Sequence, residues 1–192
     1  PTGQGVVTID TDKGKINKNF GKDGFFGFSA SLIAPIVTED KIFFSDINSN
    51  IWSFNKFSGK KLWKISTKRK DNFNGAVNWG GISYDNKRNL LYVSTGNPRG
   101  YSDYTGITRE GKNLYSNSLI AIGANKGKIK WHFTDTEHDL WDLDISFPPI
   151  LSTITYDNKK IDIVSTISKS GNILTFEREF GFRIFDYRTQ KA

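Results

Sequence analysis

Two segments of this 192-residue chain share one spacing of small, apolar and aromatic residues. The runs that begin at Ser53 and Ala121 each continue with an apolar residue, then carry a Gly six positions on and a Trp ten positions on. Each copy predicts a strand, a tight turn whose Gly takes positive φ, and a second strand with a bulky aromatic residue. Weaker copies begin at Thr8 and Thr175. Recurring hairpins of this kind restrict the chain to repetitive all-β folds.

Further strand-like runs with turn signals between them complete each hairpin to a four-stranded antiparallel unit. We expect such units over residues 32–65, 82–133 and 149–187, with a partial unit over 1–31. Units of this size with a recurrent aromatic favour the blades of a β-propeller, in which radial repetition leaves only short, protected sheet edges. The same hairpins would also suit a β-sandwich or a solenoid, and three blades plus a partial one do not close a ring.

The composition agrees with short strands and excludes several other classes. The chain holds 15 Phe, 7 Tyr and 5 Trp for a core and 18 Gly for turns, a balance that favours strands over long helices. It contains no heptad pattern and no apolar run of about 18 residues, so we expect neither a coiled coil nor a helical membrane span. A net charge of +7 would suit nucleic acid, but the cations fall in small groups at turn signals, so we expect solvated hairpin tips and no nucleic-acid partner. Zero Cys excludes disulfides and thiolate sites within these residues.

Three short motifs at the ends of strand-like runs have the chemistry of a cofactor pocket. Trp79 lies between Asn78 and a Gly-Gly pair, small neighbours that leave its indole face open to a planar ring. Asn97 precedes a Pro, which holds it extended, and its amide oxygen suits a hard cation such as calcium. Asp142 follows another Trp, and a carboxylate there could serve as a general base. Taken singly, the same motifs would also fit a core Trp, a turn and a capped loop between blades.

The sequence around Asp142 does not indicate a hydrolytic triad. His138, Asp139 and Asp144 flank this residue, but the only other histidine is His132, and no Gly-x-Ser-x-Gly elbow occurs. We therefore assign none of these neighbours a catalytic role from the sequence.

The order of these motifs resembles the quinoprotein alcohol and glucose dehydrogenases, which depend on pyrroloquinoline quinone (PQQ). The resemblance covers residues 6–187 and rests on Trp-Gly-Gly from Trp79, Thr-Gly-Asn-Pro from Thr95, Trp-His-Phe from Trp131 and His-Asp-Leu-Trp-Asp from His138. The Gly-to-Trp spacing is also similar to the tryptophan-docking repeat of these eight-bladed propellers. The resemblance implies that residues 1–192 are an internal part of one larger propeller domain, and that this part alone is inactive.

The resemblance also implies roles for five residues. Asp142 would take the hydroxyl proton of the substrate while hydride passes to the quinone. Trp79 would form the floor beneath the PQQ ring, and Lys169 and Asn172 would contact the cofactor. Asn97 would ligate a divalent cation, calcium or magnesium.

At the level of function, the resemblance implies oxidation of an alcohol or sugar hydroxyl, a periplasmic location, and an electron acceptor such as cytochrome c or ubiquinone. The family usually supplies a further Glu ligand to the metal from an earlier blade. Here residues 44–49 contain no Glu, and Asp46 is the nearest carboxylate. The alternative function is a non-catalytic propeller scaffold for protein–protein interaction, because fold alone does not decide between the two.

Overall fold

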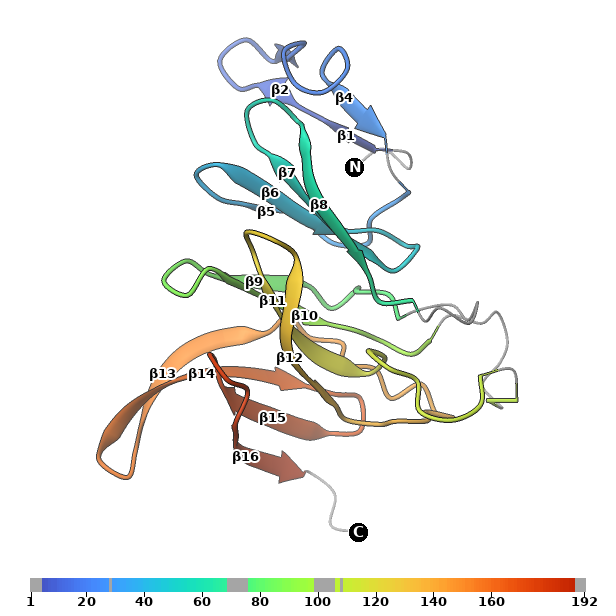
Figure 1. The fold of residues 1–192 in the computed structure, drawn as a ribbon, viewed down its shortest axis with the longest axis vertical. Helices are drawn as coiled ribbons and strands as arrows, with labels where there is room; N and C mark the ends of the chain where they lie inside the picture. The colour runs from blue at the N-terminus through green and yellow to red at the C-terminus, as the bar shows by residue number, and fades with distance from the viewer. Residues whose placement is uncertain (1–4, 28, 69–75, 99–105, 108, 189–192) are drawn as a thin grey trace.

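The computed structural model describes residues 5–27, 29–68, 76–98, 106–107 and 109–188. Three four-stranded antiparallel sheets follow one another along the chain, each a meander of consecutive strands (Figure 1). The first sheet consists of β5 (Ile36–Val37), β6 (Lys41–Ser45), β7 (Asn50–Asn55) and β8 (Lys61–Ser66). The second consists of β9 (Ile82–Asp85), β10 (Leu90–Ser94), β11 (Ser118–Gly123) and β12 (Lys128–Thr134). The third consists of β13 (Ile150–Tyr156), β14 (Lys159–Ile167), β15 (Asn172–Glu177) and β16 (Arg183–Arg188).

Two short ladders precede these sheets and correspond to the partial blade. They pair β1 (Gly5–Val7) with β4 (Phe25–Gly27), and β2 (Ile9–Asp10) with β3 (Lys15–Ile16). The stacked sheets confirm the predicted all-β propeller fold, with three four-stranded blades and a partial one. The first strand of the first sheet begins at Ile36, later than the start of the predicted unit at residue 32, and directly after Pro35, which lacks the amide hydrogen that a ladder needs. The described residues include no helix with the length and apolarity needed to cross a membrane.

The apolar core is divided among the spaces between successive sheets. Along β10, Leu91 and Val93 join a buried cluster with Phe43 of the first sheet. The alternate residues Leu90 and Tyr92 join a second cluster with residues of the third sheet. Because successive side chains of a strand point to opposite faces, β10 is buried on both sides, and this explains its uninterrupted apolar run.

The repeated tryptophans dock on the neighbouring sheet in equivalent ways, which confirms the register of the repeat. Trp63 of β8 donates through Nε1 to the carbonyl oxygen of Ala124, 2.8 Å away in the β11–β12 turn. Trp131 of β12 donates through Nε1 to the carbonyl oxygen of Arg178, 3.2 Å away in the β15–β16 turn. Each indole therefore links the last strand of one sheet to a hairpin turn of the next.

The turn glycines of the repeat make this docking possible. Gly127 and Gly181 have φ of 64° and 74°, in the left-handed region that glycine enters at little cost. An added Cβ would lie 2.7 Å from the ring of Trp63 at Gly127 and 2.5 Å from the ring of Trp131 at Gly181. The sequence spacing of Gly and Trp thus encodes contact between sheets as well as the turn within each sheet.

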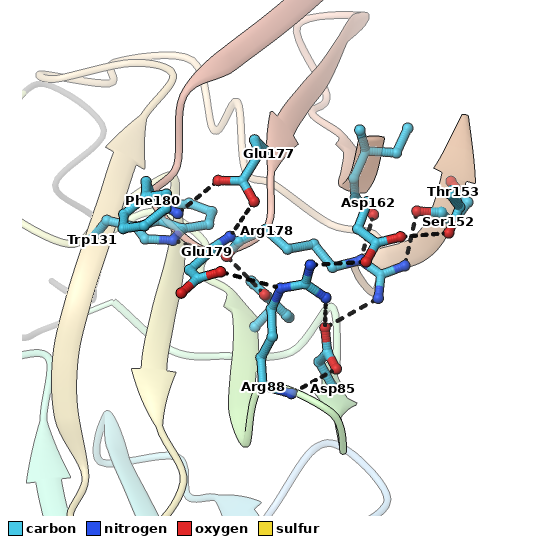
Figure 2. A network of polar contacts seen from close by, with 12 residues as sticks. Asp85, Arg88, Trp131, Ser152, Thr153, Asp162, Glu177, Arg178, Glu179 and Phe180 are labelled. Carbon is cyan, nitrogen blue, oxygen red and sulfur yellow. Dashed lines mark hydrogen bonds and ion pairs between the residues drawn. The ribbon is translucent and has the colours of Figure 1, made fainter. Parts of the chain in front are cut away.

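A polar network ties the second sheet to the third beside the docked Trp131 (Figure 2). Asp85 Oδ2 accepts from Nη1 of Arg88 and from Nη1 of Arg178, each at 3.1 Å. Arg88 Nη2 lies 2.8 Å from Asp162 Oδ2 on β14. Hydrogen bonds from Thr153 and Arg88 lower the pKa of Asp162 to about 2. The network therefore holds the two sheets together through ionised groups.

Candidate active site

The candidate site lies at one end of the sheets. Because neighbouring strands are antiparallel, the β8–β9, β10–β11, β12–β13 and β14–β15 connections leave from the same end. Hairpin turns such as 86–89 and 124–127 lie at the opposite end (Figure 1). The connections at the first end carry four of the predicted site residues, namely Trp79, Asn97, Asp142 and Lys169.

The side chain of Lys169 connects two of the other predicted residues, Asp142 and Trp79. Its Nζ lies 2.8 Å from Oδ2 of Asp142 and 2.5 Å from Oδ2 of Asp144. The same atom lies 5.1 Å from the centroid of the Trp79 ring, within the range of a cation–π contact. Burial alone would lower the pKa of Lys169, but its hydrogen bonds to the two carboxylates raise it above the ordinary value. Lys169 is therefore a fixed positive charge beside an aromatic platform.

Asp144, to which the sequence assigns no role, lies next to Asn97. The backbone N–H of Asn97 donates to Oδ1 of Asp144. Burial raises the pKa of Asp144, although the hydrogen bond from Lys169 acts in the opposite direction. Asp144 contacts Lys169, as Asp142 does, and it also contacts Asn97, so it lies in the same cluster.

The amide oxygen of Asn97 provides a test of whether a metal fits here. Asn97 Oδ1 is buried and has no hydrogen-bond partner among the described residues. Buried acceptors are normally satisfied, and a calcium or magnesium ion takes oxygen ligands of this kind. The described residues contain no group of three or more His, Asp or Glu that could hold a metal ion. Asn97 Oδ1 therefore fits one oxygen ligand of a hard cation, and the carboxylate of Asp144 accepts from the backbone N–H of the same residue.

Trp79 is held as an accessible platform. Asn78 Oδ1 accepts from Ser45 Oγ at 3.0 Å, which anchors the segment before the indole to the first sheet. Trp79 keeps 38% of its surface exposed. An added Cβ at Gly96 would lie 2.7 Å from Nε1 of Trp79 and 2.6 Å from Oδ1 of Asp144. Because Gly96 has no side chain, the Trp79 indole and the carboxylate of Asp144 can both lie against its backbone.

The loop that presents Asp142 is organised by the buried side chain of Asp139. Its carboxylate accepts from the backbone N–H of Trp141 at 2.8 Å and from Nδ2 of Asn117 at 2.6 Å. Asp142 itself has φ of 60°, a left-handed conformation that is uncommon outside glycine. Trp141 points into solvent. The sequence signal for this turn is Asp139, because an Asp side chain often accepts from the backbone N–H two residues later in the chain.

Two residues considered in the sequence make other contacts. Asn172 Nδ2 donates to Oδ1 of Asp135 at 3.0 Å, so its amide is engaged outside the cluster around Lys169. Both carboxylate oxygens of Asp46 accept from Nδ2 of Asn50, at 3.0 and 2.9 Å, and one also accepts from Nε1 of Trp52 at 2.8 Å. These bonds give Asp46 a structural role in the turn between β6 and β7.

The stacked sheets and docked tryptophans place the chain among the β-propellers. The family model described as "Glucose/ethanol/alcohol dehydrogenase, beta-propeller domain", for PQQ, matches residues 48–192. The chain belongs to this family, as the resemblance in its sequence predicts.

Individual relatives show how much of a whole protein the chain represents. Quinoprotein glucose dehydrogenase of Escherichia coli is 25% identical over 211 residues, which cover 92% of this chain and 26% of the relative. Quinoprotein alcohol dehydrogenase PedH of Pseudomonas putida is 36% identical over 120 residues, covering 62% of this chain and 18% of the relative. A solved europium-containing methanol dehydrogenase aligns with a TM-score of 0.81 over 99% of this chain and 39% of its own, and at 18% identity it shows the fold alone. The chain thus spans about a quarter or less of these two curated relatives.

Proposed function

We propose that the protein containing this chain oxidises an alcohol or sugar hydroxyl with bound PQQ as the electron acceptor, and that residues 1–192 form part of its propeller domain. The observation that carries the proposal is the cluster in which Lys169 contacts Asp142, Asp144 and the Trp79 ring. Asn97 Oδ1 is buried without a hydrogen-bond partner among the described residues, and a bound cation would satisfy this oxygen. The geometry therefore favours the enzyme over the non-catalytic propeller.

Each residue of the cluster would have its own role in binding PQQ or the cation. When bound, PQQ supplies the two-electron acceptor, and a calcium or magnesium ion beside it acts as a Lewis acid. Trp79 would stack against the planar ring, a contact worth about 1 kcal/mol beyond burial. Lys169 would place its positive charge beside the cofactor, on which negative charge develops as it is reduced. Asn97 Oδ1 and the carboxylate of Asp144 would hold the cation.

Asp142 is the proposed general base. Its side chain is 41% exposed, whereas that of Asp144 is 6% exposed, so a substrate hydroxyl can reach Asp142 but not its neighbour. Lys169 contacts both carboxylates, and Asp144 additionally accepts from the Asn97 N–H. The carboxylate of Asp142 would take the hydroxyl proton as hydride leaves the carbon, a role commonly worth about 10²–10⁴-fold in rate.

The proposal is tested on the natural full-length protein supplied with PQQ and either calcium or magnesium. We expect saturable PQQ binding and dye reduction with at least one member of a panel of primary alcohols and aldoses. Asn97→Ala should lower this activity by weakening the cation, and excess calcium should restore part of it. Asn125→Ala, which removes an exposed amide from the β11–β12 turn, is the matched control and should have no effect. A folded protein that binds no PQQ with either metal would refute the proposal and favour the scaffold.

The remaining parts of the proposal rest on the family. The 192-residue chain alone should be inactive, because a pocket completed by other blades is left open. The whole protein would act in the periplasm and pass electrons to a cytochrome c or ubiquinone. Cell fractionation and acceptor-dependent turnover of the full-length protein test these two points.

A further inference from the structure

A cleft opens between the second and third sheets, at the end opposite the candidate active site. Its larger part has a volume of about 740 Å³, and Lys87, Arg88, Lys130 and Phe180 are among its lining residues. An adjoining part of about 310 Å³ shares Arg88 and Lys130 with the first. The second and third sheets both line the larger part, whereas residues of the second sheet alone line the smaller part.

Four lysines around this cleft carry charge that no acidic group within the described chain neutralises. Lys87, Lys126, Lys128 and Lys130 are all exposed, and none forms an ion pair with another described residue. They come from two separate hairpins, which the fold brings to the same cleft. A cluster of unpaired cations raises the local concentration of anionic partners and steers their approach.

The wall of the cleft is fixed by the network around Arg88. This guanidinium is already paired with Asp85 at 3.1 Å and with Asp162 at 2.8 Å, so its charge is used inside the protein (Figure 2). Glu179, the one carboxylate among the described residues that line the cleft, lies 3.9 Å from Arg88 Nε. The four lysines therefore outnumber this carboxylate and dominate the charge that a partner meets.

Aromatic surface lies beside these cations. Phe180 is 64% exposed, and its ring centroid is 5.9 Å from that of Phe182, which is also exposed. Exposed rings surrounded by polar and charged groups are typical of the core and rim of a protein–protein interface. The rings give a partner an apolar contact that a simple counterion would not use.

We propose that this cleft docks an acidic segment of a partner protein, with carboxylates toward the four lysines and an apolar side chain against Phe180. Cations spread over two joined compartments fit a run of carboxylates better than a single small anion. Docking at this end would also leave the connections that carry Trp79 and Asp142 uncovered. The partner could therefore remain bound while the candidate active site stays open.

The test uses the full-length protein and a fluorescein-labelled peptide, Glu-Glu-Phe-Glu-Glu-Phe-Glu-Glu, in fluorescence anisotropy at low salt. We expect saturable binding that weakens as salt is raised and is absent for the peptide with Gln in place of Glu. The double variant Lys128→Glu/Lys130→Glu should weaken binding by about fivefold or more. Lys60→Glu/Lys61→Glu changes charge equally on the corresponding hairpin of the first sheet and should leave binding unchanged. Equal weakening in the two double variants would overturn the proposal.

The aromatic contact is tested separately. Phe180→Ser should weaken peptide binding, whereas Phe57→Ser, at a ring with 66% exposure in the β7–β8 turn, should not. Sedimentation with phosphatidylglycerol vesicles distinguishes a lipid surface from a protein partner. Vesicle binding that depends on Lys128 and Lys130, without peptide binding, would also overturn the proposal.

Discussion

Replacing Asp162 by Asn removes one charge from the network between the second and third sheets and keeps the size of the side chain. Asp162 Oδ2 lies 2.8 Å from Arg88 Nη2, and the pKa of the carboxyl is lowered from 3.8 to about 2. At about 1.4 kcal/mol for each unit of pKa, the full shift corresponds to about 2.5 kcal/mol. The side chain is 23% exposed, and solvent screening reduces the expected loss in Asp162→Asn to about 1–2 kcal/mol at neutral pH.

The sign of the pH dependence follows from the lowered pKa. A carboxyl with a lower pKa in the folded state stabilises the fold fully above its unfolded pKa and loses that contribution as pH falls toward its folded pKa. The contribution of Asp162 should thus be complete above about pH 4 to 5 and fall to about half by pH 3. The difference between wild type and variant should shrink in the same window.

Amide hydrogen exchange of β14 in the full-length protein measures this local stability. Wild type and Asp162→Asn are compared at the same pH, so that intrinsic exchange rates cancel. Glu39→Gln removes an acidic charge that makes no ion pair within the described residues and should change nothing. Equal exchange in wild type and Asp162→Asn at neutral pH would refute the reasoning, as would a difference that stays constant down to pH 3.

Substitutions at Gly181 and Gly96, with Gly111 as a control, allow equally direct tests. Gly181→Ala should destabilise the full-length protein by more than about 2 kcal/mol, because its Cβ would meet the Trp131 ring at 2.5 Å. Gly111→Ala has the same φ of 74° with no atom within 4 Å, so it should cost only about 1 kcal/mol of backbone strain, and equal urea midpoints would contradict the docking. Gly96→Ala should keep the fold but weaken PQQ binding about tenfold or more by displacing Trp79; unchanged affinity in a PQQ titration would refute this.

The fold could be predicted largely from the sequence because its determinants are local and repeated. In the copies that begin at Ser53 and Ala121, the Gly six positions on and the Trp ten positions on define both a hairpin and its contact with the next sheet, so Trp63 and Trp131 could be placed as equivalent. The length of the first strand was less accessible, because Pro35 removes a ladder donor within an otherwise apolar run. The apolar pattern favours a strand at Pro35, whereas the missing amide hydrogen opposes it, and the strand begins only at Ile36.

The sequence predicts only in part which residues come together in the candidate site. Trp79, Asn97, Asp142 and Lys169 each follow a strand at the same end, so the strand pattern and the family resemblance together indicate that they meet. Asp144 could not be assigned, because its defining contact is with a backbone amide 47 residues earlier in the chain.

The sequence does not predict the basic cleft either, because the residues that form it are far apart in the chain. Lys87 and Lys126 lie in separate hairpin turns, and read singly each is a solvated turn residue. Only the packing of the second sheet against the third brings these turns and Phe180 to one surface.

Single-turnover reduction of bound PQQ in Asp142→Asn tests the central claim most directly. The amide is nearly isosteric with the carboxylate but cannot accept the hydroxyl proton, so binding of quinone and metal should be largely kept. With cofactor saturated in both proteins and an alcohol or sugar that the wild type oxidises, the rate of quinone reduction should fall by about 10²–10⁴-fold. Reduction at the wild-type rate would contradict the assignment of Asp142 as the base and with it the proposed role of the cluster around Lys169.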